Sequence, residues 1–247
     1  MSKIKLSEIS TAAPADLDKK IIKKEHRKLG ERMGELQYTL YAQEKYSLLV
    51  VIQGMDASGK DGAIRDVFTH VNPQGINVKG WKAPSKEELS HDFLWRIHKY
   101  APAKGMIQCF NRSHYEDVLI TRVHKWCDDA TAVKRFAAIN DFEKLLTEHN
   151  STHILKFYLH VDHKQQMERL KERTIIPKKM WKHNDQDMEE SKKWDEYMKA
   201  YEDAINNCNA IPWHIVPSDS NWYKEYYISK IIVEKLESLN MSLPTIS

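Results

Sequence analysis

The sequence contains few of the residues that mark several protein classes. Its 247 residues include only three cysteines, an odd number without a Cys-x-x-Cys pair, which argues against a disulfide framework and favours a reducing compartment. Apolar runs are too short to span a membrane, and the N-terminal residues lack the apolar core of a signal peptide. No spacing of His and Cys fits a zinc site, and the guanine-binding pattern Asn-Lys-x-Asp is absent. We therefore expect a cytoplasmic protein without a membrane segment or a zinc site.

Apolar residues make up 41% of the chain and charged residues 30%, which is typical of a globular protein with a hydrophobic core. The length favours one α/β domain over residues 1–247. A formal net charge of +3 is too small to identify a polyanionic partner by itself, so local clusters of charge have to carry that argument.

Strand patterns, two of them apolar runs that fit buried strands (48–52 and 105–110), alternate with helical patterns along the chain. The predicted strands cover residues 48–52, 76–81, 105–110, 153–161 and 213–216. The predicted helices cover about 16–44, 63–71, 85–97, 115–125, 130–148, 191–206 and 222–239, with another that opens at 162. Residues 1–15 are expected to be loosely held, and residues 174–190 show no period. Such alternation predicts a mostly parallel, doubly wound sheet that binds ligands beyond the carboxyl ends of its strands.

The helical pattern at 16–44 carries one apolar stripe on an otherwise charged surface. The stripe consists of Ile22, Leu29, Met33, Leu36 and Leu40. It fits a helix packed on the flank of the domain, or alternatively a helix that contacts a second copy of the chain.

The first predicted strand runs into a glycine-rich turn with the P-loop spacing Gly54-x4-Gly59-Lys60. In such a loop, backbone N–H groups and the lysine ammonium surround phosphate oxygens, and the helix N-terminus adds a partial positive charge. The Ser or Thr that normally follows the lysine and binds Mg²⁺ is replaced by Asp61. The residues expected to contact phosphate are Gly54, Ala57, Ser58, Gly59, Lys60, Asp61 and Gly62.

Two acids stand inside this loop. Phosphate would repel Asp56 unless a cation lay between them, so we interpret Asp56 as a metal ligand or as a base that takes a proton from an attacking phosphate. Asp61 either supports such a cation indirectly or caps the helix that follows.

The third predicted strand leads into Asn111-Arg112-Ser113-His114-Tyr115-Glu116-Asp117, a position where P-loop enzymes keep an acid for Mg²⁺. Glu116 and Asp117 are the candidates for this acid, and the planar fork of Arg112 can bridge two phosphoryl groups. The structural alternative is that acids in a first helical turn simply favour the helix dipole. Trp81, after the second strand, either stacks on a base or packs in the core.

A basic segment lies between the fourth and fifth predicted strands. Against a single acid, Glu172, it contains Arg169, Lys171, Arg173, Lys178, Lys179 and Lys182. Such a run is either a solvated helix face or a lid of the kind that nucleotide kinases close over phosphates to exclude water. Binding of a long polyanion to these cations would weaken with salt.

These motifs resemble the polyphosphate kinase type 2 family over about residues 16–235. The main marks are Gly54–Gly62, in which an aspartate after the lysine is normal for the family, and Phe110–Leu119. Further matches are Trp181-Lys182, Trp194-Asp195 with Tyr197, and Pro212–Pro217.

The resemblance implies a P-loop kinase-like, three-layer α/β/α fold around a central, mostly parallel five-stranded sheet. It adds an N-terminal helical extension at about 16–45 and a helical lid at about 169–195. The implied reaction moves the terminal phosphoryl of inorganic polyphosphate to a nucleoside mono- or diphosphate, reversibly and with Mg²⁺. Mn²⁺ is the alternative metal ion. The Asn-Arg-Ser-His-Tyr-Glu-Asp form looks like the subgroup that accepts AMP and ADP, with GMP and GDP as further candidates. Family members commonly form dimers or tetramers.

The resemblance also implies roles for individual residues. The implied catalytic residues are Asp56, Lys60, Arg112 and Asp117, of which Asp56 and Asp117 are the metal ligands. Arg112 and Arg173 join the phosphate-binding set given above. The implied nucleotide-binding residues are Lys82, Asn111, Arg112, Glu116 and Arg122. The implied polyphosphate-binding cations of the lid are Arg169, Arg173, Lys178, Lys179 and Lys182.

Two other functions compete with this interpretation. An ATP-dependent nucleoside monophosphate kinase would use the same P-loop. A nucleic-acid-binding module would use the basic segment and the tryptophans, but the P-loop has no place in it and no RNA- or DNA-binding signature is present. We therefore expect no nucleic-acid partner.

Overall fold

The computed structural model describes residues 3–245 and contains one sheet of five parallel strands in the order β2-β3-β1-β4-β5. The strands are β1 (Ser47–Gly54), β2 (Ile76–Gly80), β3 (Ile107–Asn111), β4 (Thr152–His160) and β5 (Trp213–Pro217). The predicted five-stranded sheet is confirmed, and every pair of neighbouring strands in it is parallel.

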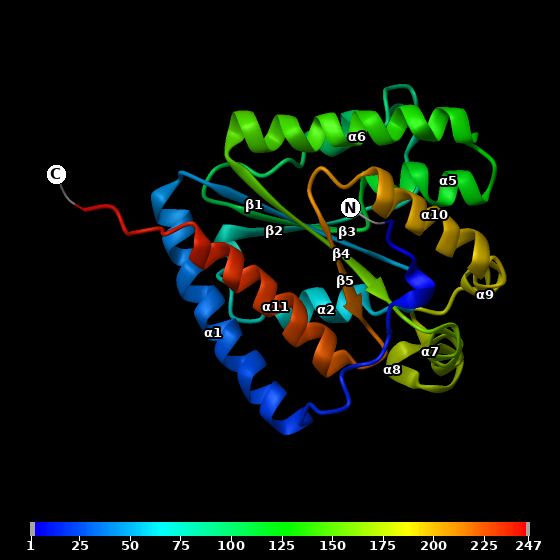
Figure 1. Cartoon of the computed structure of the whole chain (residues 1–247), viewed down its shortest axis with the longest axis horizontal. Helices are drawn as coiled ribbons and strands as arrows, with labels where there is room; N and C mark the ends of the chain where they lie inside the picture. Colours follow the sequence, from blue (N-terminus) through cyan, green and yellow to red (C-terminus); the bar gives the residue numbers. More distant parts are fainter. Residues whose placement is uncertain (1–2, 246–247) are drawn as a thin grey trace.

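Helices cover both faces of the sheet, which gives the expected three layers (Figure 1). One face is covered by α1 (Lys19–Gln43), α2 (Lys60–Val67) and α11 (Asn221–Ser238), the other by α6 (Asp129–Asn150) and α10 (Trp194–Asn207). Strand β1 is buried along its whole length, and its side chains alternate between the two cores. Val50 faces the α1 side and Val51 the α6 side.

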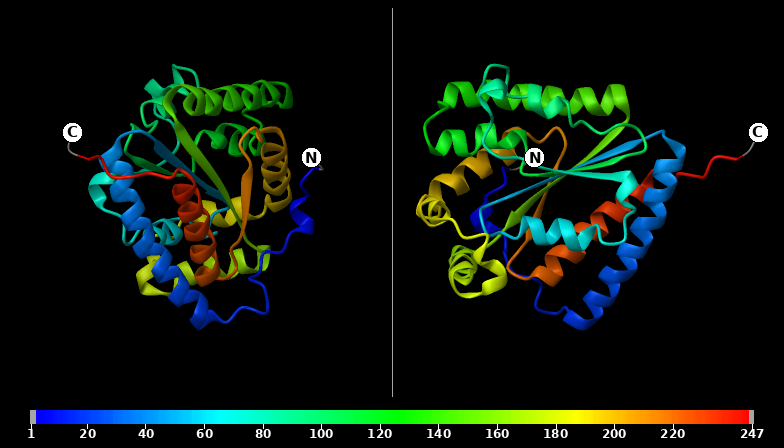
Figure 2. Two further views of the ribbon diagram at one scale, coloured as in Figure 1. Left: turned by 60° about the vertical axis from the view of Figure 1, so that its left-hand side comes forward. Right: turned by 180° about the vertical axis from the view of Figure 1, so that it is seen from behind.

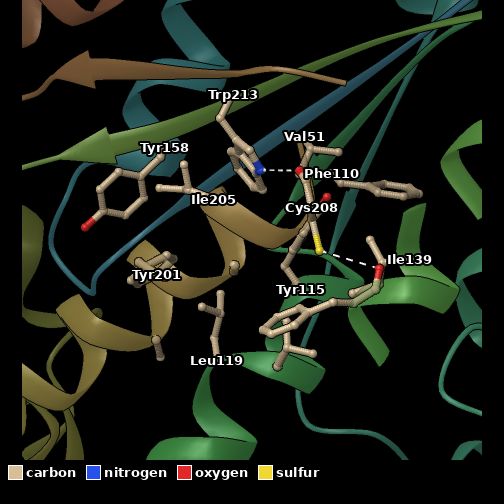
Figure 3. Packing of buried hydrophobic residues seen from close by; sticks show 14 of the residues in the cluster. Val51, Phe110, Tyr115, Leu119, Ile139, Tyr158, Tyr201, Ile205, Cys208 and Trp213 are labelled. Atoms are coloured by element: carbon tan, nitrogen blue, oxygen red, sulfur yellow. Dashed lines mark hydrogen bonds between the residues drawn. The ribbon is translucent and has the colours of Figure 1, made fainter. Parts of the chain in front are cut away.

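The core on the α6 side is rich in aromatic residues (Figure 3). The rings of Tyr115 and Trp213 meet edge to face with centroids 4.7 Å apart. Trp213 also donates its indole N–H to the carbonyl oxygen of Cys208 at 3.1 Å. All three cysteines are buried and free, so they pack as small apolar side chains.

The N-terminal helix α1 packs along α11, as both views in Figure 2 show. The Asp18 carboxylate accepts hydrogen bonds from the N–H groups of Lys20 and Ile21, so the helix begins three residues later than the predicted start at 16. Met33 and Leu40 of its apolar stripe are fully buried. The stripe therefore packs within the chain, as the first of the two interpretations expected.

The predicted helix at 85–97 is wrong, because the chain forms two short helices, α3 (Lys86–Leu89) and α4 (Trp95–His98). The predicted capping box of Ser85 is present, but polar side chains then compete for the backbone. The Ser90 hydroxyl donates to the carbonyl of Glu87 at 2.7 Å, and the Asp92 carboxylate caps the N–H of Leu94 at 2.9 Å.

The predicted helix at 115–125 is likewise replaced by a 3₁₀ segment, His114–Val118, and the short helix α5 (Ile120–Val123). The 3₁₀ geometry places residues three apart on one side. Tyr115 and Val118 both enter the core.

The loosely held N-terminus was also a wrong prediction for the described residues 3–15. Leu6 is buried, its N–H donates to Glu202 at 2.9 Å, and its carbonyl lies 3.1 Å from His160 Nε2. Leu6 sits in a 3₁₀ turn, Leu6–Glu8, and this segment crosses the end of β4.

Beyond the carboxyl end of β4 the chain forms α7 (His163–Ile175), α8 (Pro177–Met180) and α9 (Asp185–Ser191) before α10 (Figure 1). Pro177 occupies the first turn of α8, where its missing N–H costs nothing. These short helices occupy the segment that showed no period. A further 3₁₀ turn, Pro73–Gly75, precedes β2. Among the described residues, no helix combines the length and apolarity that a membrane span requires.

Candidate phosphate-binding active site

The glycine-rich turn joins the carboxyl end of β1 to the N-terminus of α2, as the P-loop pattern predicts. Gly54 and Gly59 have φ angles of 153° and 95°, which favour glycine. A Cβ atom at Gly54 would lie only 2.8 Å from Ser58 Oγ and 3.0 Å from the carbonyl of Leu159. The compact loop therefore depends on glycine at both positions.

Several backbone donors of this loop point to no protein acceptor. Within residues 3–245, no hydrogen bond is made by the N–H groups of Gly59, Lys60, Asp61 and Gly62. Consecutive unpaired N–H groups at a helix N-terminus form the concavity that binds phosphate oxygens. The loop thus has the donors that the sequence motif implies.

The ammonium of Lys60 lies folded against the loop that it is predicted to serve. It is buried and donates to the carbonyls of Gly54 at 2.7 Å and Met55 at 3.0 Å. Burial and the nearby Arg112 lower the pKa of Lys60 to about 8. Because phosphate oxygens would favour the charged form, an anion on the loop would raise this pKa again.

Asp56 and Arg112 form an ion pair across the ends of β1 and β3. Arg112 has a φ of 61° and its N–H donates to the carbonyl of Ile52 at 3.0 Å, which turns the side chain toward the loop. Burial by itself would raise the pKa of Asp56, but the cations of Arg112, Lys60 and Arg173 hold it below its usual value. Asp56 is therefore ionised near neutral pH.

A narrow pocket opens beside this pair, between the P-loop and helices α9 and α10. It is lined by Gly54, Met55, Asp56, Arg112, Glu116, Ile120, Gln166, Asp187, Glu190, Ser191, Tyr197 and Tyr201. Glu116 reaches the pocket, and its carboxylate lies 3.5 Å from Arg112 Nη1. Asp117 does not line it.

Asp117 lies in a different environment from Asp56. Its carboxylate is 4.0 Å from Arg135 Nη1, which also donates to the backbone carbonyl of Asp117 at 2.7 Å. Burial raises the pKa of Asp117 to about 6, against the opposing effects of Arg135 and Arg96. The two predicted metal ligands therefore do not share one ligand cluster.

The metal prediction can be compared with the available oxygen ligands. Among the described residues, no group of three or more His, Cys, Asp or Glu side chains is arranged to hold a metal ion. Mg²⁺ does not need such a group, because it keeps several waters and binds through one or two carboxylates together with substrate phosphates. The ionised Asp56, beside the free amides of the loop, fits that mode of binding.

Asp61 connects three parts of the site. Its carboxylate accepts hydrogen bonds from Asn111 Nδ2 at 2.8 Å, at the end of β3, and from Lys182 Nζ at 2.6 Å, in the lid. The earlier alternatives were indirect support of a cation or helix capping. The contacts show that Asp61 also joins the P-loop helix to the predicted lid segment.

Two acids of the predicted lid segment, Asp187 and Glu190, line the pocket and make contacts there. Arg173 is paired with Asp187 and also donates to the carbonyl of Lys182 at 3.3 Å. The Glu190 carboxylate lies 2.9 Å from His124 Nε2 and accepts from the Tyr197 hydroxyl at 2.7 Å. Arg173 thus comes near the loop, since it is one of the cations that lower the pKa of Asp56.

Other predicted residues do not converge on the loop in the same way. Arg122 pairs with Asp129 at 2.7 Å and Asp203 at 3.0 Å. Lys82 and Lys178 are exposed, and Lys179 pairs with Glu172 inside the lid.

Trp81 is buried and packs edge to face on Phe110, with ring centroids 5.3 Å apart. The structure therefore agrees with the second interpretation of Trp81, in which the ring packs in the core.

Sequence reasoning missed residues that contact the loop from a distance along the chain. Gln166 donates to the carbonyl of Asp56 at 3.0 Å, and the buried Lys224 donates to the carbonyl of Gly59 at 3.3 Å. Both lie on helices whose spacing gives no sign of this role. For Lys224, the one available signal was the residue type, because a lysine stands on a largely apolar face of α11.

The comparisons with known proteins agree with this geometry. A family model described as Polyphosphate kinase 2 matches residues 16–244. A Meiothermus ruber protein named AMP/ADP-polyphosphate phosphotransferase is 44% identical, over 87% of this chain and 81% of the relative. A Rhodopseudomonas palustris protein named ADP-polyphosphate phosphotransferase is 42% identical, over 87% of this chain and 78% of the relative.

The same likeness is found among solved structures. The crystal structure of Polyphosphate Kinase 2 from Arthrobacter aurescens TC1 superimposes with a TM-score of 0.96 at 38% identity, and covers 100% of this chain and 90% of that one. Sequence and fold thus agree over nearly the full length. The chain belongs to the polyphosphate kinase 2 family.

Proposed function

We propose that this protein is a polyphosphate-dependent nucleotide kinase, which transfers the terminal phosphoryl of inorganic polyphosphate to a nucleoside mono- or diphosphate, reversibly. The observation that carries the proposal is the row of unpaired N–H groups at Gly59–Gly62, beside the Asp56–Arg112 pair and beneath a cationic lid. The names of relatives that are 44% and 42% identical support it.

In this proposal the donor lies on the P-loop. Phosphoryl transfer needs in-line positioning and neutralisation of charge on the phosphoryl oxygens more than covalent chemistry from the protein. The ammonium of Lys60 leaves the carbonyls of Gly54 and Met55 to bind the donor, and Arg112 bridges donor and acceptor phosphates. The remaining phosphate-binding residues are the ones predicted from the motif, together with Arg173.

We assign the two carboxylates different roles. A bound Mg²⁺, or Mn²⁺, supplies charge neutralisation at the transferred phosphoryl group. Asp56 would hold it, since a carboxylate with a lowered pKa is a poor base. For Asp117, which does not line the pocket, the proposed roles as catalytic residue and metal ligand rest on the resemblance, and its pKa of about 6 would suit the uptake of a proton from an acceptor phosphate near neutral pH.

The finer assignments rest on the resemblance. We propose nucleotide binding by Lys82, Asn111, Arg112, Glu116 and Arg122, and contacts of polyphosphate with Arg173, Lys178, Lys179 and Lys182. We further propose acceptance of both AMP and ADP, a cytoplasmic location, and a homodimer or homotetramer. The whole chain is proposed to be one domain, with the helical extension at about 16–45 and the lid at about 169–195.

The test is incubation with Mg²⁺, polyphosphate and AMP, ADP, GMP or GDP in turn, with products resolved by chromatography. We expect the next higher nucleotide, and Lys60→Ala should lower kcat at least about 10²-fold because it removes charge stabilisation of the transition state. Phosphorylation of AMP by ATP but not by polyphosphate would instead identify an ATP-dependent kinase. Tight retention of RNA on a filter without any nucleotide product would point to a nucleic-acid-binding module.

A further inference from the structure

Two cations hold the back of the P-loop, on the side away from its unpaired N–H groups. Arg169 lies on α7 and Lys224 on α11, and both donate to backbone carbonyls of residues 57–59. In the described part of the chain, neither side chain forms an ion pair with a carboxylate.

Arg169 uses its guanidinium entirely on backbone oxygens. One nitrogen donates to the carbonyls of Ala57 at 3.2 Å and Ser58 at 3.1 Å. The other donates to Ser218 at 2.7 Å and Asp219 at 2.8 Å, in the turn between β5 and α11. The residue was predicted to bind polyphosphate, but these contacts direct it to the loop backbone instead.

Lys224 is 1% exposed, and its ammonium donates to Asn221 Oδ1 at 3.0 Å, Gly59 O at 3.3 Å and Ser58 O at 3.4 Å. A Cβ atom at Gly59 would lie 2.3 Å from this ammonium, so the glycine makes room for it. Burial and the neighbouring Arg169 lower the pKa of Lys224 to about 8. The carboxylates of Glu225 and Asp66 only partly offset this effect.

The carbonyl contacts fix the direction of the free amides. In a planar trans peptide, the C=O of one residue and the N–H of the next point in opposite directions. Carbonyls of Ser58 and Gly59 that face Lys224 therefore turn the N–H groups of Gly59 and Lys60 toward the substrate side. A buried cation without a carboxylate partner is costly, and phosphates on the front of the loop would supply the missing negative charge.

We propose that Lys224 and Arg169 are positioning residues, which hold the P-loop amides in the orientation that binds the polyphosphate donor and add positive charge behind them. The inference rests on the proposed function, because it assigns the donor to this loop. It predicts a specific loss of donor binding, whereas a role in folding alone would affect donor and nucleotide alike.

The experiment compares Lys224→Met and Arg169→Met with Lys230→Met, which removes an exposed lysine of the same helix α11. We expect the KM for polyphosphate and the Kd for tripolyphosphate, measured by calorimetry, to rise about 10-fold in the first two variants, as loss of charged hydrogen bonds implies. The KM for the nucleotide should change less than about 2-fold, and Lys230→Met should match the wild type.

Donor affinities within about 2-fold of the wild type in both variants would overturn the inference, even if their melting temperatures fall. If Lys224→Met does not fold, Asn221→Ala decides, since it removes the side chain that orients the ammonium: a rise of about 3-fold in the tripolyphosphate Kd is expected, and no rise counts against the inference. Failure of the proposed function is recognised separately, because the wild type would then form no product with polyphosphate.

Discussion

The regions around Asp56 and Asp117 follow two neighbouring strands of the sheet, β1 and β3. Even so, the pKa of Asp56 lies below the ordinary value of a carboxyl and the pKa of Asp117 lies above it. Burial by itself would raise the pKa of both groups. At Asp56 the cations of Arg112, Lys60 and Arg173 outweigh that effect, whereas at Asp117 the more distant Arg135 does not. The difference shows that the number and distance of nearby cations, more than depth, decide in which direction the pKa of a buried carboxyl moves.

The largest expected effect is that of Asp56→Asn. Removing the ionised carboxylate should lower kcat by about 10²–10³-fold, as loss of a preorganised charge in an active site does. The melting temperature should also fall, because Arg112 would lose its partner in a partly buried setting. Steady-state kinetics and thermal melts measure both effects. Glu31→Gln, which breaks an exposed pair with Arg27 on α1, serves as the matched control and should leave both unchanged.

Asp117→Asn should lower kcat about 10²-fold but should increase stability, the reverse of Asp56→Asn in that respect. Ionising a carboxyl whose pKa is raised from 3.8 to about 6 costs the folded state about 1–3 kcal/mol above pH 6. The neutral amide avoids this cost. The gain in melting temperature should be complete above pH 6 and shrink as the pH falls through 6, and it should vanish only below the unfolded-state pKa of 3.8, where the wild-type carboxyl is protonated in both states.

A melting temperature for Asp117→Asn at pH 7.5 that falls as far as that of Asp56→Asn would contradict the comparison. It would mean that Asp117 is stabilised in its charged form, like its counterpart. Thermal melts of both variants at pH 5 and pH 7.5, in the same buffers, separate the two cases.

The P-loop region could be predicted from sequence because its information is local. Gly54, Gly59 and Lys60 lie within seven residues of chain, and residues 48–52 of the strand before them are continuously apolar. The sheet was predictable for a similar reason, since five short strand patterns alternate with helical patterns along the chain. Short-range patterns fix both features.

The contacts around the P-loop and the two carboxylates could not be predicted, since they join residues far apart in sequence. Arg112 reaches Asp56 from 56 residues away, and Lys224 reaches Gly59 from 165 residues away. Arg135, which sets the surroundings of Asp117, lies on α6 with no motif around it. The two broken helices were missed for another reason, because polar side chains and 3₁₀ geometry override the helical period locally.

The smallest expected effect concerns the contact between the lid and Asp61. The pair of Lys182 and Asp61 is partly exposed, so Lys182→Met should raise the KM for polyphosphate only about 3-fold and leave kcat nearly unchanged. The difference should shrink at high salt. Lys192→Met, which removes an exposed lysine paired with Glu189, is the control and should behave as the wild type.

Asp61→Asn distinguishes the two ways in which Lys182 can act, because it removes the pair but keeps the lysine. If the pair serves to hold the lid closed, Asp61→Asn should raise the KM for polyphosphate as much as Lys182→Met does. If Lys182 binds the donor itself, releasing it from Asp61 should leave that KM unchanged or lower it. Equal increases in both variants would therefore place the function of Lys182 in lid closure, and would limit the cations that contact polyphosphate to the rest of the proposed set.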